Sequence, residues 1–383
     1  MIRANILPLA AALALAFSGH ACAAAEQIVK IGHVAPTSGG IAYIGKDLEN
    51  GVRMAIDEQN AKNLVIGGKK IKFELLAEDD AGDPKQGTAV AQKMVDAKVH
   101  GVIGHLNSGT TIPASRIYYD AGIPQISPGA TNPKYTQQGY NTAFRVVAND
   151  SQLGGALGRY ATDVLKAKNI AVIDDRTAYG QGLATEFIKG ARKQSPAVNI
   201  VSQQYTTDKA TDFSAILTAI KAKKPDVIFF GGLDSVGGPM LRQMKQLGID
   251  AKFIGGDAIC TREIVKLAGD ALGEGHVYCA EAGGVVDANK KSLDNFKTAY
   301  QKKFNLEVQI YSPYSYDATN AMIAAMQQAK SVEPAKYLPF LAKINYKGVS
   351  GTIAFDAHGD IKNGALTIYT YKGGNRTLVT VTR

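Results

Sequence analysis

Long apolar runs are scarce in this sequence, and the one that stands out lies near its start. It covers residues 6–17, fewer than the roughly 20 residues that a membrane-spanning helix needs. Arg3 precedes this run and Ala21-Cys22-Ala23 follows it, an order typical of a secretory signal. We therefore expect residues 1–25 to be a signal peptide that is removed on export; a buried N-terminal helix and a lipoprotein signal acylated at Cys22 are the alternatives. No second run of this kind follows, so we expect nothing in the mature chain to span a membrane.

Cysteine is also rare. The chain has 3 cysteines, and one of them, Cys22, falls in the expected signal peptide. Cys260 and Cys279 remain, and an exported protein folds in an oxidising compartment. A disulfide between these two residues is the favoured interpretation, and two buried free thiols are the alternative.

The signature motifs of several enzyme classes are absent. The sequence contains no Gly-x-Ser-x-Gly elbow, no phosphate-binding Gly-x-x-x-x-Gly-Lys-Ser/Thr loop and no His-Glu-x-x-His pair. Gly231-Gly232 follows a predicted strand, but the rest of the dinucleotide fingerprint does not follow it. The histidines lack metal-ligand spacing, and His105 is interpreted as a structural residue at a strand end. We expect a protein that is not an enzyme and that needs neither a cofactor nor a metal.

Charge of one sign is not concentrated in any part of the chain. Lys and Arg number 43 against 34 Asp and Glu, a formal net charge of +9 that falls by one when Arg3 leaves with the signal peptide. Basic and acidic residues alternate along most of the sequence, without the arms or motifs typical of nucleic-acid binding. We expect a soluble protein with a solvated charged surface, and we do not expect nucleic acid as a partner.

The sequence does contain a repeated alternation of strand-like and helical segments. Without residues 1–25 the chain still exceeds the about 250–300 residues that one hydrophobic core supports, so two domains are expected. Asp83-Pro84 supplies a helix start, and apolar residues at helical spacing predict a buried face in residues 48–56. A later helix is expected to bury Ala215, Ile216, Ala219 and Ile220. Repetition of this kind predicts an α/β protein with parallel sheets covered by helices. Strands are expected at Ile28–Val34, Ile71–Leu75, Val99–Gly104, Ile123–Ser127, Ile170–Asp174, Asn199–Tyr205, Val227–Gly231 and Lys252–Gly255.

Breaks in this alternation divide the chain into lobes. The alternation slackens around Asn141–Gly154, where we place the first crossing between the lobes. Later come two helical stretches, Ser292–Phe304 and Pro313–Lys330, then a turn at residues 355–360 and a closing pair of strands. The first lobe is expected to comprise residues 26–148 and 285–355, and the second lobe residues 149–284 and 356–383.

Two strand ends carry small and polar residues suited to binding a carboxylate. One strand runs into Asn107-Ser108-Gly109-Thr110-Thr111, a helix start whose free N–H groups and dipole attract an anion. The next strand ends in Ser127-Pro128-Gly129-Ala130-Thr131, where small residues let a ligand approach the backbone. Taken alone, each stretch is more often a helix cap or a turn than a binding site. Ligands of open α/β sheets bind beyond the carboxyl ends of the strands, so two facing lobes would place these loops around one cleft.

Several stretches also match the motifs of one known family, in that family's order. They are Glu78 to Gln86, Gly104-His105-Leu106, Ile126 to Pro133, Tyr179 to Ala184, Met240 to Gln243 and Ala268-Gly269-Asp270. Together they resemble the leucine/isoleucine/valine-binding proteins of bacterial ABC transporters over essentially the whole mature chain. The resemblance implies a type I periplasmic binding protein fold, two Rossmann-like lobes with parallel central sheets joined by a three-stranded hinge. It also implies a monomeric carrier in the periplasm that captures a free L-amino acid, closes by hinge motion and docks on a membrane permease. The alternatives are a carrier for an aromatic, small or polar amino acid and a ligand-sensing receptor module.

The resemblance also implies which residues hold the charged ends of the ligand. In the family a serine and backbone N–H groups bind the α-carboxylate, at positions that match Ser108 and Thr131, with Ala130 in the same loop. The carbonyl of Gly129 and the hydroxyl of Thr131 are expected to face the α-ammonium, together with Asp257, where relatives usually have a glutamate. Tyr179 matches a tyrosine that closes over the ligand, and an aromatic packed on its own lobe is the alternative.

Other departures from the family concern the pocket for the ligand's side chain. Ile44 and Leu233 stand where the family often has aromatic residues, which keeps the pocket apolar but reshapes it. Asp234 is either a solvated loop carboxylate or, if it enters the cleft, a group that favours a polar or cationic ligand. The two cysteine positions of the family's disulfide near the cleft hold Gly82 and Asn107 here.

Overall fold

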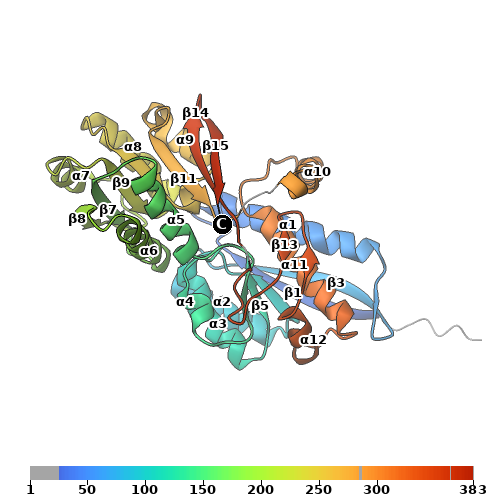
Figure 1. The fold of residues 1–383 in the computed structure, drawn as a ribbon. Coiled ribbons are helices and arrows are strands. Elements are labelled where there is room, and N and C mark those ends of the chain that lie inside the picture. The colour runs from blue at the N-terminus through green and yellow to red at the C-terminus, as the bar shows by residue number, and fades with distance from the viewer. Residues whose placement is uncertain (1–25, 284–286, 363, 383) are drawn as a thin grey trace, which may run out of the picture.

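The computed structural model describes residues 26–283, 287–362 and 364–382, which form two lobes lying side by side (Figure 1). The expected signal peptide, residues 1–25, lies outside the described residues. Among the helices of the described residues, none combines the length and the apolar character needed to cross a membrane.

The first lobe is built on a sheet with the strand order β2-β3-β1-β4-β5-β6. Its strands are β1 (Glu26–Ala35), β2 (Val65–Ile66), β3 (Lys69–Asp79), β4 (Gly101–Gly104), β5 (Gln125–Ser127) and β6 (Ala143–Arg145). Its helices are α1 (Ala42–Ala61), α2 (Pro84–Asp96), α3 (Ser108–Asp120), α4 (Lys134–Gln137), α10 (Asp287–Phe304), α11 (Ser312–Gln328) and α12 (Pro334–Leu341), with a small hairpin of β12 (Tyr346–Lys347) and β13 (Thr352–Ile353). In this sheet β3 and β1, β1 and β4, β4 and β5, and β5 and β6 pair in parallel.

Both faces of this sheet are covered by helices. In β4, Val102 belongs to an apolar cluster with residues of α2 and α3, whereas Ile103 belongs to the cluster that contains residues of α1 and α11. Successive side chains of a strand point to opposite faces, so a strand buried on both faces is continuously apolar. This is why the sequence shows apolar runs here instead of alternation.

The second lobe has a sheet with the order β15-β14-β11-β10-β9-β7-β8. Its strands are β7 (Asn169–Asp174), β8 (Asn199–Tyr205), β9 (Val227–Gly231), β10 (Lys252–Gly255), β11 (Val277–Glu281), β14 (Leu366–Lys372) and β15 (Asn375–Thr382). Its helices are α5 (Asp150–Asp163), α6 (Ala178–Gln194), α7 (Ser214–Lys221), α8 (Asp234–Gln246) and α9 (Glu263–Ala268), with the 3-10 turns η1 (Asp257–Ile259) and η2 (Gly269–Leu272). The pairs from β8 to β11 are parallel, and β14 and β15 are antiparallel strands that the end of the chain adds to the sheet.

The predicted strands are confirmed, and β8, β9 and β10 have the predicted bounds. The predicted helix start is confirmed as well, because the Asp83 carboxylate accepts hydrogen bonds from the first backbone N–H groups of α2. The stripe predicted in α7 is confirmed in part: Ile220 is buried and Ile216 is partly buried, whereas Ala215 and Ala219 are exposed and Leu217 is buried in their place. Large apolar residues at helical spacing compete for the inner face, and burying Leu217 removes more apolar surface from water than burying an alanine. Strand β11 and helix α12 are among the elements that were not predicted.

The segments that cross between the lobes lie together. The N–H of Ala148 donates to the carbonyl of Ala282 at 3.1 Å, and a Cβ on Gly364 would lie 3.3 Å from that of Ala148. The turn that precedes Gly364 contains Asp360, which forms an ion pair with the fully buried Arg145 of β6 at 2.6 Å. This ion pair attaches the turn to the first lobe. The hinge therefore consists of three neighbouring segments, as the type I fold requires.

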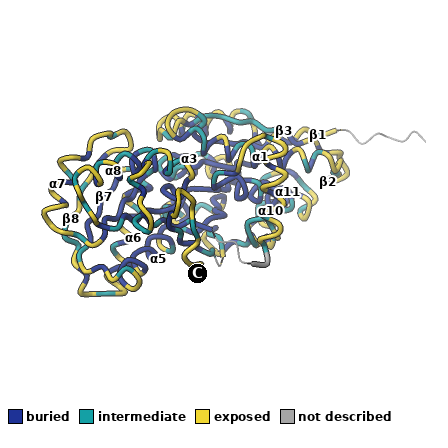
Figure 2. The backbone as a smooth tube through the Cα atoms, turned by 90° about the horizontal axis from the view of Figure 1, so that it is seen from above, coloured by how far each residue is buried: buried dark blue, intermediate teal, exposed yellow. Residues whose placement is uncertain are grey.

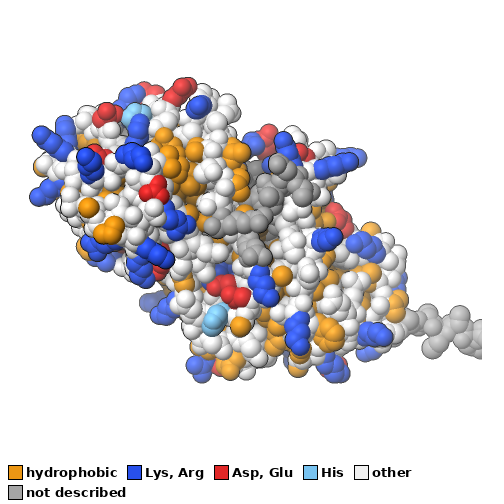
Figure 3. Space-filling view, viewed as in Figure 1, with side chains coloured by type: hydrophobic (Ala, Val, Ile, Leu, Met, Phe, Trp, Pro, Cys, Tyr) orange, Lys and Arg blue, Asp and Glu red, His pale blue; other side chains and the backbone are white. Residues whose placement is uncertain are grey.

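Burial follows the two lobes. Buried segments run through the middle of each lobe, and exposed segments outline the periphery (Figure 2). The largest apolar cluster contains residues from both lobes, such as Ile103 and Phe229. On the face shown in Figure 3, Lys and Arg side chains are spread over both lobes with acidic side chains among them.

Candidate ligand-binding site

A small cavity of about 30 Å³ lies between the lobes, beside loops that follow strands of both sheets. This is the edge of parallel sheets at which ligands usually bind. It is lined by Ile41, Ile44, Leu106, Asn107, Ser108, Gly129 and Tyr311 from the first lobe and by Tyr179, Leu233, Asp257 and Ala258 from the second. A larger hollow of about 480 Å³ lies beside α10, β14 and β15, and none of the predicted ligand-binding residues lines it.

Most of the predicted ligand-binding residues meet at the small cavity. Those that line it are Ile44, Ser108, Gly129, Tyr179, Leu233 and Asp257. Ala130 and Thr131 are buried in the loop that follows Gly129, but they do not line the cavity. The structure thus brings together residues that are up to about two hundred positions apart in the sequence.

Hydrogen bonds tie the two loops of the first lobe to each other. The hydroxyl of Ser108, the first residue of α3, accepts from the N–H of Asn132 at 3.2 Å. The hydroxyl of Ser127 accepts from the N–H of Ala130 at 2.9 Å and donates to the carbonyl of His105 at 2.8 Å. These bonds fix the backbone around Ser108 and Gly129.

The side chain of His105 holds the loop that follows β4 in place. The ring is fully buried, with Nδ1 2.8 Å from a carboxylate oxygen of Asp80 and Nε2 3.1 Å from the hydroxyl of Tyr118. Both ring nitrogens are occupied by these contacts, which agrees with the structural role predicted for His105. Within the described residues, no group of three or more His, Cys, Asp or Glu side chains could hold a metal ion.

Asp257, the first residue of η1, lies at the cavity and contacts α6 and the residue that precedes α11. Its fully buried carboxylate accepts from the hydroxyl of Tyr179 at 2.8 Å and from that of Tyr311 at 2.6 Å. Burial raises the pKa of Asp257, and the two tyrosine hydrogen bonds oppose the rise. Asp257 does not cap the following helix α9, because the N–H of Ile264 in that helix donates to the hydroxyl of Thr261.

Tyr311 is the residue of this cavity that sequence reasoning missed most clearly. It directly precedes α11, a helix of the first lobe, yet its hydroxyl reaches Asp257 of the second lobe. Its only sequence signal is its place before Ser312-Pro313, a pair typical of a helix start. Tyr311 does not follow a strand, so the pattern of polar residues at strand ends did not indicate it.

Asp234 is not the solvated loop carboxylate that one interpretation made it. It is fully buried, and one of its oxygens accepts hydrogen bonds from the hydroxyls of Tyr43 and Thr261. Burial raises the pKa of Asp234, and these hydroxyls oppose the rise. Asp234 does not line the small cavity; instead it joins α8 of the second lobe to α1 of the first.

Other polar contacts also bridge the two lobes. The amide of Asn132 donates to the carbonyl of Ala178 at 2.6 Å, and Arg262 forms an ion pair with Glu307. With the hydroxyl contacts of Tyr43 and Tyr311, these contacts hold the lobes in a closed arrangement.

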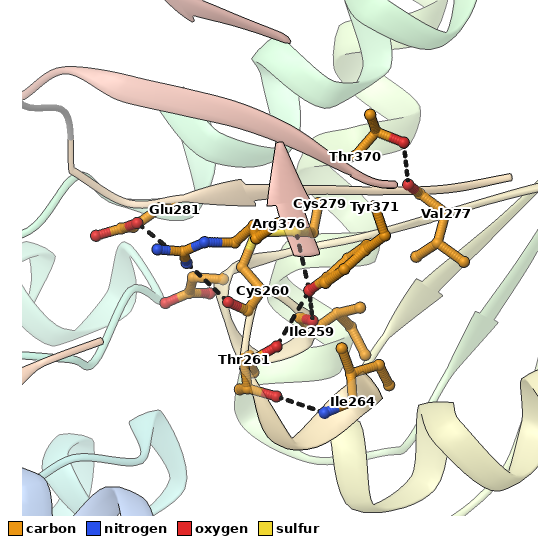
Figure 4. The surroundings of a disulfide bond; sticks show 12 residues. Ile259, Cys260, Thr261, Ile264, Val277, Cys279, Glu281, Thr370, Tyr371 and Arg376 are labelled. Carbon is orange, nitrogen blue, oxygen red and sulfur yellow. Dashed lines mark hydrogen bonds and ion pairs between the residues drawn. A yellow bond between two sulfur atoms is a disulfide. The ribbon is translucent and has the colours of Figure 1, made fainter. Parts of the chain in front are cut away.

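A disulfide fixes the chain beyond Asp257. Cys260 and Cys279 are bonded, with Cα atoms 5.3 Å apart, which confirms the favoured interpretation of this pair (Figure 4). Tyr371 of β14 donates to the carbonyl of Ile259 at 3.1 Å, and Arg376 of β15 donates to that of Cys260 at 2.8 Å. The turn η1 is therefore attached to β11 covalently and to the C-terminal strands by hydrogen bonds.

Asp150, the first residue of α5, is a buried carboxyl near the cavity. It is fully buried, and within the described residues neither of its oxygens has a hydrogen-bond partner, although the hydroxyl of Thr131 lies close to it. Burial raises the pKa of Asp150 from 3.8 to about 8, with the nearby Thr131 hydroxyl opposing the rise. At pH values between about 4 and 8, the Asp150 carboxyl keeps its proton in the folded chain and has lost it in the unfolded chain.

This difference predicts a pH dependence of stability. The free energy of unfolding should fall as pH rises from about 4 to 8, by up to about 1.4 kcal/mol per pH unit from Asp150. Asp150→Asn should flatten this slope, whereas Asp163→Asn, at the exposed end of the same helix, should leave it unchanged. Denaturant unfolding of the ligand-free proteins at several pH values measures the slopes; equal slopes for wild type and Asp150→Asn would contradict the assignment.

Comparisons with known proteins agree with this architecture. The family model described as periplasmic binding protein matches residues 28–375. The Leu/Ile/Val-binding protein homolog 1 of Brucella abortus is 36% identical over 373 residues, which cover 95% of each chain. A leucine-binding protein of Thermotoga maritima superposes with a TM-score of 0.84 at 26% identity, covering 92% of this chain and 98% of that one. A branched-chain amino acid-binding protein of Streptococcus pneumoniae, solved with isoleucine, gives 0.81 at 27% identity, covering 92% and 99%. The chain therefore belongs to the periplasmic binding protein family, whose members are substrate-binding proteins of transporters and not enzymes.

Proposed function

We propose that this protein captures a free L-amino acid between its lobes and delivers it to the membrane permease of an ABC transporter. The observation that carries the proposal is the meeting of two kinds of group at one cavity. Free backbone N–H groups at the start of α3 and the Ser108 hydroxyl come from the first lobe, and the buried carboxylate of Asp257 comes from the second. These are the groups that a zwitterion needs, a donor set for its carboxylate and a negative charge for its ammonium.

The remaining walls suit an aliphatic side chain. Ile41, Ile44, Leu106 and Leu233 line the cavity, and they place apolar surface from both lobes around the position of the ligand's side chain. The Brucella abortus relative is named for leucine, isoleucine and valine and the Thermotoga maritima relative for leucine, and the Streptococcus pneumoniae relative was solved with isoleucine. We therefore propose a branched-chain amino acid as the ligand. The cavity of about 30 Å³ in the closed arrangement favours, as a second candidate, a carrier for a smaller amino acid.

The cavity size also implies that the lobes move. Pockets that enclose small molecules usually measure about 300–1,000 Å³, so an amino acid enters this site only when the lobes separate. Opening would break the contacts of Asp257 and Asp234 across the cleft and bend the three hinge segments. We propose that residues 26–148 and 285–355 move as one lobe and residues 149–284 and 362–383 as the other. The turn at residues 356–361, which was expected in the second lobe, would move with the first lobe, because Asp360 pairs with Arg145.

We also propose where the protein is located and in which assembly state it acts. The expected signal peptide at residues 1–25 would direct the chain to the periplasm, where it would be removed. We propose that the mature protein is a monomer, because in a carrier of this kind the permease makes its contacts with one closed molecule. Ligand-driven closure would then be the signal that the permease recognises.

Thermal shift of the ligand-free protein tests the proposed ligand. Leucine, isoleucine or valine should raise the melting temperature, because a ligand that binds only the folded state stabilises it, by about 2.7 kcal/mol at one hundred times its Kd. The amides and N-acetyl forms of the same amino acids should have little effect, since each lacks one charged end. Comparing the twenty common amino acids at equal concentration ranks them directly.

The outcomes of this screen separate the two candidates. Stabilisation by alanine, serine or glycine without any by leucine would replace the branched-chain proposal with the smaller ligand. An amide that stabilises as well as the free amino acid would contradict recognition of the carboxylate at Ser108.

A further inference from the structure

One carboxylate of the first lobe is surrounded by backbone donors. Asp47 of α1 is buried, and it accepts hydrogen bonds from consecutive N–H groups in the segment that leads into α11. The donors are Gln309 at 3.1 Å, Ile310 at 3.3 Å, Tyr311 at 3.0 Å and Ser312 at 2.9 Å. A single side chain thus accepts from four consecutive N–H groups, three in the segment before α11 and one at its first residue, Ser312.

The sequence of α11 explains why this helix needs an outside acceptor. Its N-cap is Tyr311, whose side chain makes no cap hydrogen bond, and the N–H of Ser312, the first residue of the helix, has no partner within the helix. Asp47 supplies that partner from α1, and its negative charge lies at the positive end of the α11 dipole. Burial raises the pKa of Asp47, and the bonds from Ser312 and Gln309 oppose the rise.

The same segment carries a wall of the cavity. Tyr311 lines it, and its hydroxyl donates to Asp257 across the cleft at 2.6 Å. Ile44, three residues before Asp47 on α1, lines it as well. The Asp47 carboxylate therefore fixes the backbone of Tyr311 relative to the helix that carries Ile44.

We propose that Asp47 is a positioning residue for ligand capture, which holds the Tyr311 hydroxyl where it can meet Asp257 when the lobes close. This inference rests on the proposed function, because it makes the proposed ammonium partner depend on a residue outside the cavity. Asp47 itself does not line the cavity. Its effect on binding should therefore pass through Tyr311.

A double-mutant comparison tests this dependence. Asp47→Ala should weaken leucine binding at least fivefold by calorimetric titration, and Asp47→Asn, which keeps one acceptor oxygen and the side-chain shape, should recover part of that loss. In a Tyr311→Phe background, which lacks the hydroxyl, Asp47→Ala should change affinity less than twofold. The matched control is Asp57→Ala, a half-exposed carboxylate of the same helix, which should bind as wild type.

A second readout needs no ligand. Because Tyr311 joins the lobes, Asp47→Ala and Tyr311→Phe should each shift the ligand-free protein toward a larger lobe separation in small-angle scattering, and the double variant should shift no further. If wild type binds none of the common amino acids, the proposed function fails, and the scattering series still decides the role of Asp47. A lower melting temperature with unchanged affinity and unchanged lobe separation would show that Asp47 only supports the fold and would overturn the inference. If Asp47→Ala does not fold, the same comparisons are made with Asp47→Asn.

Discussion

Replacing Asp257 with alanine should weaken amino acid binding by roughly a hundredfold or more. The carboxylate is fully buried at the cavity, where its negative charge is the proposed partner of the ligand's ammonium. Removing one member of a buried charge pair typically costs about 3–5 kcal/mol, and about 1.4 kcal/mol corresponds to tenfold in affinity. Calorimetric titration of the wild type and the variant with the ligand found by thermal shift measures the loss.

The alanine variant also leaves the hydroxyls of Tyr179 and Tyr311 without their acceptor, so the ligand-free protein should lose about 1–3 kcal/mol of stability. Asp257→Asn separates the two effects, because the amide oxygen still accepts a hydrogen bond but the charge is gone. We expect Asp257→Asn to unfold close to the wild type and still to bind much more weakly. Asp270→Ala, an exposed carboxylate of the same lobe, is the matched control. Near-normal affinity of both Asp257 variants would remove this residue from the site.

Loss of the disulfide should have the largest effect on stability. The bond between Cys260 and Cys279 closes a loop with a sequence separation of 19. A cross-link over a loop of this size stabilises a protein by about 3 kcal/mol, mainly by restricting the unfolded chain. The double variant Cys260→Ser/Cys279→Ser should therefore unfold at lower denaturant concentration by that amount.

Reductant provides the control for this prediction. Wild-type protein should lose stability when reduced, and the double serine variant should not respond. Mass spectrometry of the unreduced protein should find it two hydrogens lighter than the reduced form. Two thiols that alkylate in the native, unreduced protein would show that the bond does not form. Because η1 lies directly before Cys260, the reduced protein should also bind its ligand more weakly.

Local sequence patterns predicted the parts of the fold that depend on short stretches of chain. Strands β9 and β10 have the predicted bounds because each is a short, largely apolar run between turn residues. The loops after β4 and β5 were identified for a similar reason, since small and hydroxyl residues directly follow a buried strand. Their positions at the cavity follow from the topology of parallel sheets.

The rest of the site depends on contacts between distant segments. Asp47 and Tyr43 lie on α1, and Tyr311 directly precedes α11. Nothing in their immediate sequence shows that Tyr311 reaches Asp257 and Tyr43 reaches Asp234. The burial of Asp234 likewise results from α1 closing over it. Ala215 and Ala219 were predicted to be buried in α7 because spacing alone does not show which of several possible faces meets the core. Such features are set by three-dimensional packing, which a local pattern does not contain.

The way the chain completes its first lobe affects the order in which that lobe can fold. Helix α11 packs against α1 in the core, and the hydrogen bond between Gln59 and Asn320 spans 261 residues. Between these helices the chain passes through most of the second lobe, whose strands β7 to β10 pair with near neighbours in the sequence. Contacts between segments so far apart form slowly, because a long loop must close first. The parallel strands of the second lobe can therefore assemble before the first lobe is finished, although the first lobe contains the earlier residues. We therefore expect the order in which the lobes fold to differ from the order in which their residues are synthesised.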